Sequence, residues 1–252
     1  APDLAITFNA IRAGALDVIE KPGGFDHSDL ETIRQKLVTT VKLMAEIKVI
    51  RRRAMRPITP LTAAFNHPLR SKKPLGVVAV GASTGGPTAL NTILKSLPRD
   101  FPAPIVVVQH IASGFTKGLV DWLQTESQLP MKIVTREERI HSGQVYFAPD
   151  DHHLVFSSRD VLMLNREPPM SHVRPSATVL FNSVAPIYGA EAAGVLLTGM
   201  GDDGAAGMVA MHQRGALTLA QDENTCVVYG MPKVAVELGA VDADERQAEG
   251  VV

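Results

Sequence analysis

The sequence has almost no cysteine and no long apolar run. Its 252 residues include a single cysteine, which excludes an internal disulfide framework and is typical of a reducing compartment. No apolar stretch approaches the roughly 20 residues that cross a bilayer, and no signal peptide is visible at the start of the sequence. The formal net charge of −1 provides no global field that would attract nucleic acid or an anionic membrane. These absences predict a cytoplasmic protein that neither inserts into a membrane nor binds nucleic acid.

Acidic residues are missing from one internal stretch. Residues 51–75 contain seven Lys or Arg and four Pro but no Asp or Glu, a composition typical of an exposed linker. The run Arg51–Arg53 is also a candidate nucleic-acid patch, although no aromatic residues are interleaved with it. We therefore expect a linker between an N-terminal part over residues 1–50 and a main domain over residues 76–245, with a short tail over residues 246–252.

The N-terminal part predicts one strand and two helices. A helix is expected over residues 5–13, a strand over 16–20, and a second helix after the capping box Ser28–Glu31. Because so few elements cannot close a hydrophobic core, we expect this part to pack against another part of a protein or to be partly disordered.

Apolar, β-branched runs alternate with helical patterns from residue 76 onward. The expected strands cover residues 76–80, 105–109, 194–198 and 216–220, and the expected helices cover Thr88–Leu97, 115–124, 176–188 and a stretch beginning near Ala205. Residues 131–165 instead form short runs between turn residues, which is typical of antiparallel hairpins. The pattern predicts an α/β fold, doubly wound and Rossmann-like, with a mostly parallel sheet and an antiparallel hairpin region.

Polar motifs directly follow several of these apolar runs: GASTGG at 81–86, QH at 109–110 and GMGDDG at 199–204. Because the carboxyl ends of parallel strands meet at one edge of a sheet, we expect Ser83, His110 and an acid of the third motif to lie together. A hydroxyl, an imidazole and a carboxylate are the parts of a serine-hydrolase triad. Spacing alone leaves open whether Asp203 or Asp202 orients the histidine while the other caps the following helix.

Other chemistries fit these motifs less well. A dinucleotide-binding turn would need Gly where Ser83 stands, and an acidic residue at the next strand end, where Gln109 and His110 stand instead. The run Asp150–His153 contains metal-ligand residue types, but it follows a proline in an expected hairpin, so a solvated turn is the simpler interpretation. We expect no metal site there.

Further site residues are expected around the same strand ends. Backbone N–H groups near Thr84, Met200 and Gly201 are candidates for an oxyanion hole, and Arg174, just before an expected helix, is a candidate substrate contact. In this mechanism His110 takes the proton of Ser83 as its oxygen attacks a carbonyl, and water hydrolyses the resulting acyl-serine.

The motifs also resemble those of a known family. Together with RPS at 174–176 and the run AQDENTCVVYGMP, they resemble the catalytic domain of the chemotaxis protein-glutamate methylesterase family, CheB, over residues 75–242. In that family the serine of GASTGG is the nucleophile, the histidine of QH is the base and the last Asp of GMGxDG is the acid. The resemblance therefore implies Ser83, His110 and Asp203 in these roles, and selects Asp203 over Asp202.

The resemblance implies an activity as well. Family members hydrolyse γ-glutamyl methyl esters on chemoreceptor helices and release methanol, many also deamidate glutamines, and they need no metal or organic cofactor. For this chain it implies methylated chemoreceptor cytoplasmic helices as the substrate and a role in bacterial chemotaxis. The chemotaxis histidine kinase is a further candidate partner.

Residues 1–50 are similar to the last part of a response-regulator receiver domain, in which Lys21 and Pro22 resemble the receiver's Lys-Pro pair. The strands that would carry the phosphoacceptor aspartate are absent, and the chain begins in mid-pattern, as a fragment or processed product would. We therefore expect phosphorylation control to be missing and this part to restrain activity little.

Other functions compete with this one. The same enzyme in another signalling pathway, a binding module that docks a kinase or receptor, and a dinucleotide-dependent enzyme are the alternatives. An intact triad argues against the binding module, and the missing glycine fingerprint argues against the nucleotide enzyme.

Overall fold

A computed structural model describes residues 7–11, 13–15, 34, 37–38, 41–42, 44–45 and 74–242. In chain order its strands and helices are β1 (Val77–Ala82), α3 (Gly86–Leu94), β2 (Ile105–Gln109), α4 (Thr116–Glu126), β3 (Met131–Ile133), β4 (Glu138–Arg139), β5 (Val145–Phe147), β6 (His153–Ser158), β7 (Val161–Asn165), α5 (Ala177–Tyr188), a 3₁₀ turn (Gly189–Glu191), β8 (Ala192–Leu196), α6 (Ala205–Gln213), β9 (Leu217–Ala220) and α7 (Met231–Glu237).

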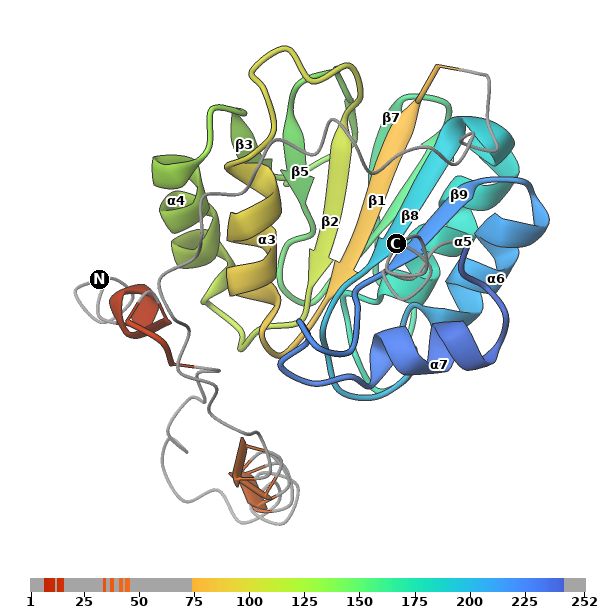
Figure 1. Ribbon diagram of the computed structural model, residues 1–252. Coiled ribbons are helices and arrows are strands. Elements are labelled where there is room, and N and C mark those ends of the chain that lie inside the picture. Colours follow the sequence, from red (N-terminus) through yellow and green to blue (C-terminus); the bar gives the residue numbers. More distant parts are fainter. Residues whose placement is uncertain are drawn as a thin grey trace, which may run out of the picture.

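A six-stranded sheet runs through the main domain in the order β3-β5-β2-β1-β8-β9 (Figure 1). All of its neighbouring strands pair in parallel. Every residue of β2 is buried, and Val78 is the one residue of β1 that is not fully buried, as expected for β-branched runs covered on both faces. The predicted α/β fold with a mostly parallel sheet is therefore confirmed.

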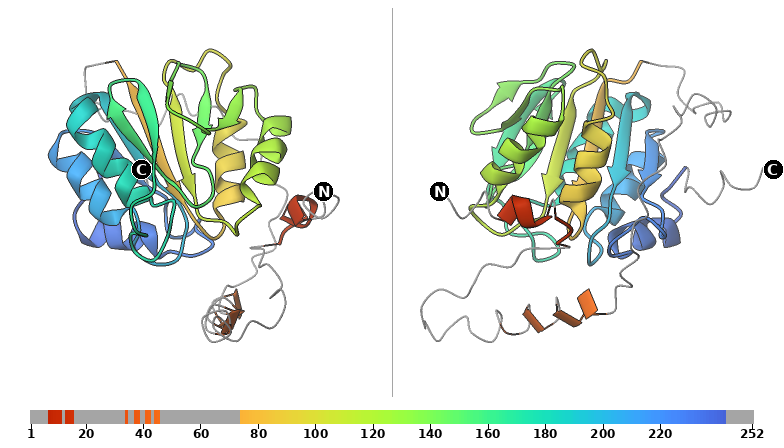
Figure 2. Two further views of the ribbon diagram at one scale, coloured as in Figure 1. Left: turned by 180° about the vertical axis from the view of Figure 1, so that it is seen from behind. Right: turned by 60° about the vertical axis from the view of Figure 1, so that its left-hand side comes forward.

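Alternation along the central strands supplies two separate cores. Val77 of β1 belongs to a core that it shares with Phe181 of α5. Val80, on the other face of the same strand, belongs to a core with Leu90 of α3 and Leu119 of α4. Figure 2 shows α3 and α4 covering one face of the sheet and α5 and α6 covering the other.

A second, three-stranded sheet with the order β4-β7-β6 is antiparallel. Leu154 and Leu162 from this sheet join the core around α5. The prediction of antiparallel hairpins over 131–165 is correct for this sheet but wrong for β3 and β5, which extend the parallel sheet. All three residues of β5 are buried, because the strand lies between β3 and β2 and is covered on both faces.

The other predicted elements of the main domain are present with shifted ends. Strand β8, for example, begins at Ala192 instead of 194, and helix α3 ends at Leu94 instead of Leu97. The predicted strand over 16–20, the linker up to residue 73 and the tail lie outside the described residues. The division of the chain into these parts stays a prediction.

A short N-terminal stretch packs onto the main domain. Residues 7–11 are helical, inside the predicted helix over 5–13. The Phe8 ring stacks on Trp122 of α4 with the ring centroids 6.1 Å apart, and both Phe8 and Ile11 are buried. This packing agrees with the expectation that the N-terminal part leans on another. In the part of the chain that the structure describes, no helix is both long and apolar enough to cross a membrane.

Phe181 tests the core around α5. Phe181 is fully buried. It packs closely against α6, since a Cβ added at Gly207 would lie 2.6 Å from the Cβ of Phe181. We expect Phe181→Ala to lower the free energy of unfolding by about 3–5 kcal/mol, because it removes a buried ring and leaves a cavity. Leu238→Ala, which truncates a side chain that is 54% exposed, should change it by less than about 0.5 kcal/mol. Urea unfolding followed by circular dichroism measures both, and equal losses would contradict this placement.

Candidate active site

The carboxyl ends of β1, β2 and β8 form the edge at which the motifs meet. Strand β1 lies between β2 and β8, and Ala82 pairs with Gln109. Ser83 and His110 are therefore the next residues on neighbouring strands, whose spacing is roughly 4.8 Å. The chain leaves β1 toward β2 and later returns on the opposite side as β8, which makes this edge a topological switch point, the usual ligand site of such sheets.

His110 is paired with Asp203 at this edge. Its Nε2 atom lies 2.9 Å from Oδ2 of Asp203, and the imidazole is 13% exposed. Because an ionised carboxylate can only accept, Nε2 carries the hydrogen and Nδ1 remains as the basic nitrogen. In the serine-protease arrangement the acid contacts Nδ1, so the imidazole is turned the other way round here. Asp202 is exposed, so Asp203 is the acid that the structure brings to His110.

Asp203 is 3% exposed, and each oxygen of its carboxylate accepts two hydrogen bonds. Oδ1 accepts from the Ser176 hydroxyl at 2.6 Å and from the Thr178 N–H at 3.1 Å. Oδ2 accepts from the Ala177 N–H at 2.6 Å as well as from His110. Burial alone would raise the pKa of Asp203, but the interactions with His110, Ser176 and Ala177 outweigh it and lower that pKa to about 2. The carboxylate therefore stays ionised at neutral pH.

Ser83 stands in a turn that requires glycine around it. Gly85, the N-cap of α3, has a φ of 80°, and a Cβ there would lie 2.6 Å from Val227. A Cβ on Gly199 would lie 2.6 Å from the Cβ of Ser83, so the first and third motifs are in contact. The Ser83 N–H donates to the Thr198 carbonyl at 3.0 Å, which fixes the serine to the segment that follows β8.

Gln109 is a site residue that the sequence did not reveal. It is 7% exposed, and its Nε2 atom donates to the carbonyls of Ser83 and His110, each at 2.8 Å. Gly86 leaves room for it, since a Cβ there would lie 2.1 Å from Gln109 Oε1. One amide therefore ties together the two backbone segments that carry the hydroxyl and the imidazole. Its position beside His110 was the only available signal.

The oxyanion-hole candidates surround this edge. Met200 is 42% exposed, and Gly201 has a φ of 88°. Within the described residues, no acceptor takes the N–H groups of Met200 and Gly201. Thr84 is half-buried, and its carbonyl accepts from Thr198 Oγ1 at 2.9 Å, which orients the peptide that follows. The role of all three as oxyanion donors stays a prediction.

Arg174 is engaged within the protein. Its Nε and Nη2 atoms donate to Asp151 Oδ1 at 3.1 and 2.6 Å, and its Nη1 atom donates to the carbonyls of Arg166 and Glu167. The side chain is 21% exposed. Arg174 thus holds the loop before α5 in place, and a contact with substrate stays a prediction.

The run Asp150–His153 is spread over separate contacts. The Asp150 carboxylate binds the start of α4. His153 is fully buried, where its Nδ1 accepts from the Ser176 N–H at 3.1 Å and its Nε2 lies 3.2 Å from the Pro168 carbonyl. The interpretation as a solvated turn is therefore wrong for His153, because its ring joins two backbone segments. No cluster able to hold a metal occurs among the residues that the structure describes.

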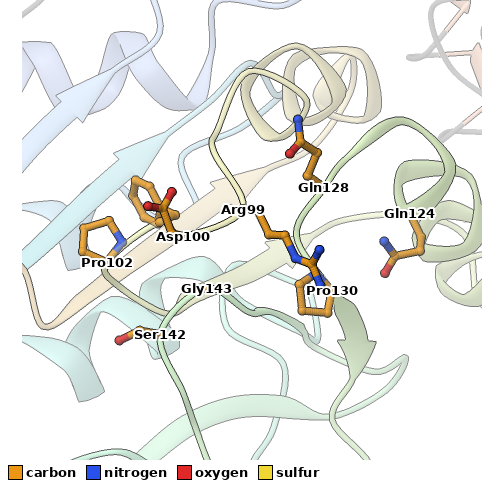
Figure 3. A pocket seen from close by; sticks show the side chains of 9 residues that line it. Arg99, Asp100, Pro102, Gln124, Gln128, Pro130, Ser142 and Gly143 are labelled. Carbon is orange, nitrogen blue, oxygen red and sulfur yellow. The ribbon is translucent and has the colours of Figure 1, made fainter.

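A cavity of about 690 Å³ lies at the other end of the strands (Figure 3). Its lining comes from α4 and from the segments that lead into β2, β3 and β5, namely Arg99, Asp100, Phe101, Pro102, Gln124, Gln128, Pro130, Ser142 and Gly143. These side chains are exposed or half-buried. Because the cavity is at the amino ends of the strands, it cannot present a ligand to Ser83 and His110.

The fold and site define an α/β protein with an imidazole–carboxylate pair at its switch point, and known proteins are similar to it in sequence. A domain described as CheB methylesterase matches residues 78–250. A Nitrosospira multiformis protein named protein-glutamate methylesterase/protein-glutamine glutaminase is 45% identical over 240 residues, which are 94% of this chain and 68% of that protein. A Myxococcus xanthus protein of the same name, numbered 4, is 46% identical over 236 residues, which are 93% of this chain and 67% of the Myxococcus protein.

A solved structure is similar as well. The catalytic domain of the Thermotoga maritima CheB methylesterase is 41% identical, with a TM-score of 0.65, and the match covers 67% of this chain and 90% of that one. The chain belongs to the CheB methylesterase family. The likeness of residues 1–50 to a receiver domain stays a prediction.

The low pKa of Asp203 links the site to stability. Since this pKa is lowered in the folded state, the ionised carboxylate stabilises the fold above its ordinary pKa, and this stabilisation is lost as the pH falls toward 2. We expect the wild type to lose about 1 kcal/mol more than Asp203→Asn between pH 7 and pH 3. Urea unfolding of both proteins at the two pH values measures the difference. Parallel losses would show that Asp203 has an ordinary pKa in the folded protein.

Proposed function

We propose that this chain is a serine hydrolase with protein-glutamate methylesterase and protein-glutamine glutaminase activity. The observation that carries the proposal is the His110–Asp203 pair beside Ser83 at the carboxyl edge of the sheet, in a chain of the CheB methylesterase family. Relatives over 40% identical are named for both activities.

The first half of the reaction forms an acyl-enzyme. Ser83 Oγ attacks the side-chain carbonyl carbon of a γ-glutamyl methyl ester while His110 Nδ1 takes the hydroxyl proton. Asp203 stabilises the imidazolium that forms. The N–H groups of Met200 and Gly201, with that of Thr84, bind the oxyanion, and one such donor contributes about 3 kcal/mol in typical enzymes.

The second half releases the products. The intermediate collapses, methoxide takes the proton from His110 and methanol leaves. Water then attacks the acyl-serine with His110 again as the base, and a glutamate side chain is released. With a glutamine substrate, ammonia leaves in place of methanol. Each bond change has a protein group assigned to it, so the proposal requires neither a metal nor an organic cofactor.

The substrate is proposed to be a helix of a chemoreceptor's cytoplasmic region, so the enzyme acts in the cytoplasm in chemotaxis signalling. Support comes from the family and from the accessibility of the edge, where Ser83 is half-buried and Met200 is 42% exposed. A side chain that projects from a helix can reach such an edge. Arg174 is proposed to border it, and the chemotaxis histidine kinase stays a further candidate partner.

Methanol release from methylated chemoreceptor cytoplasmic fragments tests the function. We expect Ser83→Ala to lower the rate by roughly 1,000-fold or more, because removing a nucleophile abolishes the covalent route. Ser142→Ala is the matched control, since it removes an exposed hydroxyl at the opposite end of the sheet and should leave the rate unchanged. No release by the folded wild type would point to another substrate or to a binding module.

A further inference from the structure

Ser176 is the one side chain besides His110 that bonds to Asp203 within the described residues. Its hydroxyl oxygen lies 2.6 Å from Oδ1, and the residue is fully buried. A hydroxyl has one hydrogen to donate, and a carboxylate can only accept, so that hydrogen is committed to Asp203. Hydrogen bonds of this length to a charged acceptor are stronger than those between neutral groups.

The position of Ser176 is fixed from two sides. Its hydroxyl oxygen accepts from the Val179 N–H at 3.3 Å, as the N-cap of α5. Its backbone N–H donates to Nδ1 of the buried His153 at 3.1 Å. The hydroxyl cannot turn away from Asp203 without leaving a carboxylate lone pair unsatisfied in the interior, which is costly.

The orientation of the Asp203 carboxylate decides which oxygen faces the imidazole. Thr178 and Ala177 hold one oxygen each through backbone N–H groups that the first turn of α5 sets in place. The Ser176 hydroxyl is the remaining donor on Oδ1 and the one that a substitution can remove directly. Without it the carboxylate gains freedom to rotate, and Oδ2 moves off the line to His110 Nε2.

We propose that Ser176 is a positioning residue, whose hydroxyl holds Oδ1 of Asp203 so that Oδ2 receives the His110 hydrogen. The proposal rests on the proposed function, because it needs His110 as the base. Ser176 is fully buried, and its link to His110 runs through Asp203. The predicted effect therefore falls on the chemical step and not on substrate binding.

The test measures methanol release by the full chain from methylated chemoreceptor cytoplasmic fragments. We expect Ser176→Ala to lower kcat by about 10- to 100-fold, with KM changed by less than about twofold. Ser176→Gly also lacks the hydroxyl but suits an N-cap, so it carries the same test if the alanine variant does not fold. A folded variant with kcat within about twofold of the wild type would overturn the proposal.

Ser183→Ala is the matched control. Ser183 lies on the same helix, donates to the Leu180 carbonyl at 2.7 Å and accepts from the Phe156 N–H at 3.0 Å. Its removal costs hydrogen bonds of α5 without touching Asp203, so kcat should stay within about twofold of the wild type. A loss as large as that of Ser176→Ala would mean that any weakening of α5 has this effect, and the proposal would fail.

A double-mutant cycle with Asp203→Ala separates the proposal from the proposed function. In that background the Ser176 substitutions should lower kcat no further, because the group that the hydroxyl holds is gone. A further loss of about 10-fold would rule out action through Asp203. The rate at which a serine-directed phosphonate labels Ser83 gives the same comparison where turnover is too slow. If Ser83→Ala released methanol as fast as the wild type, the proposed function itself would fail.

Discussion

Parallel pairing of β1 with β2 on one side and β8 on the other is the constraint on which the site depends. The ladder runs past the ends of the named strands: the His110 N–H donates to the Ala82 carbonyl, and the Ser83 N–H donates to the Thr198 carbonyl. The backbone bonds that build the sheet therefore also set the separation of the hydroxyl and the imidazole. A slip of one residue in this register would turn every side chain of β1 to the opposite face, so the two cores on those faces keep the site in register.

Asp203 is held by the first turn of α5 and not by the pairing of the strands. An uncompensated buried carboxylate would be strongly destabilising. Here Ser176, Ala177 and Thr178 supply donors within one helical turn, and His110 supplies the remaining one. The low pKa of Asp203 follows from this arrangement, in which burial works against ionisation and the donors outweigh it. His110 and the helix end together keep the carboxylate ionised, and the helix end holds it in place in the interior.

Sequence patterns predicted the features that depend on local signals. Apolar runs followed by GASTGG, QH and GMGDDG were enough to place Ser83, His110 and an acid of the third motif at one sheet edge, because strand ends in a parallel sheet converge. The choice of Asp203 over Asp202 needed the family resemblance. Strands β3 and β5 were assigned to hairpins, since a run of three residues carries no sign of whether its neighbours pair in parallel. Ser176 stands at the start of the helix predicted over 176–188, but its bond to Asp203 spans 27 positions and leaves no trace in spacing.

Gln109 and His153 illustrate the same limit. Both act on backbone atoms: Gln109 on the carbonyls of Ser83 and His110, and His153 on the Ser176 N–H. Every residue type has backbone N–H or carbonyl groups, so the residues that Gln109 and His153 bind cannot be recognised from the sequence. Such contacts emerge only once the strands are paired and α5 is docked.

The place of β8 in the sheet has a consequence for the chain as it is being synthesised. Strand β2 is synthesised soon after β1, but the strand that pairs with the other edge of β1, Ala192–Leu196, is made only much later. During that interval the growing chain presents an apolar strand edge, the kind of surface that attracts other strands. Ser83 and His110 have already been synthesised at this stage, but Asp203 follows only after β8, the strand that pairs with the free edge of β1. Pairing of the second edge of β1 and completion of the His110–Asp203 pair thus depend on the same short stretch of chain, from Ala192 to Asp203.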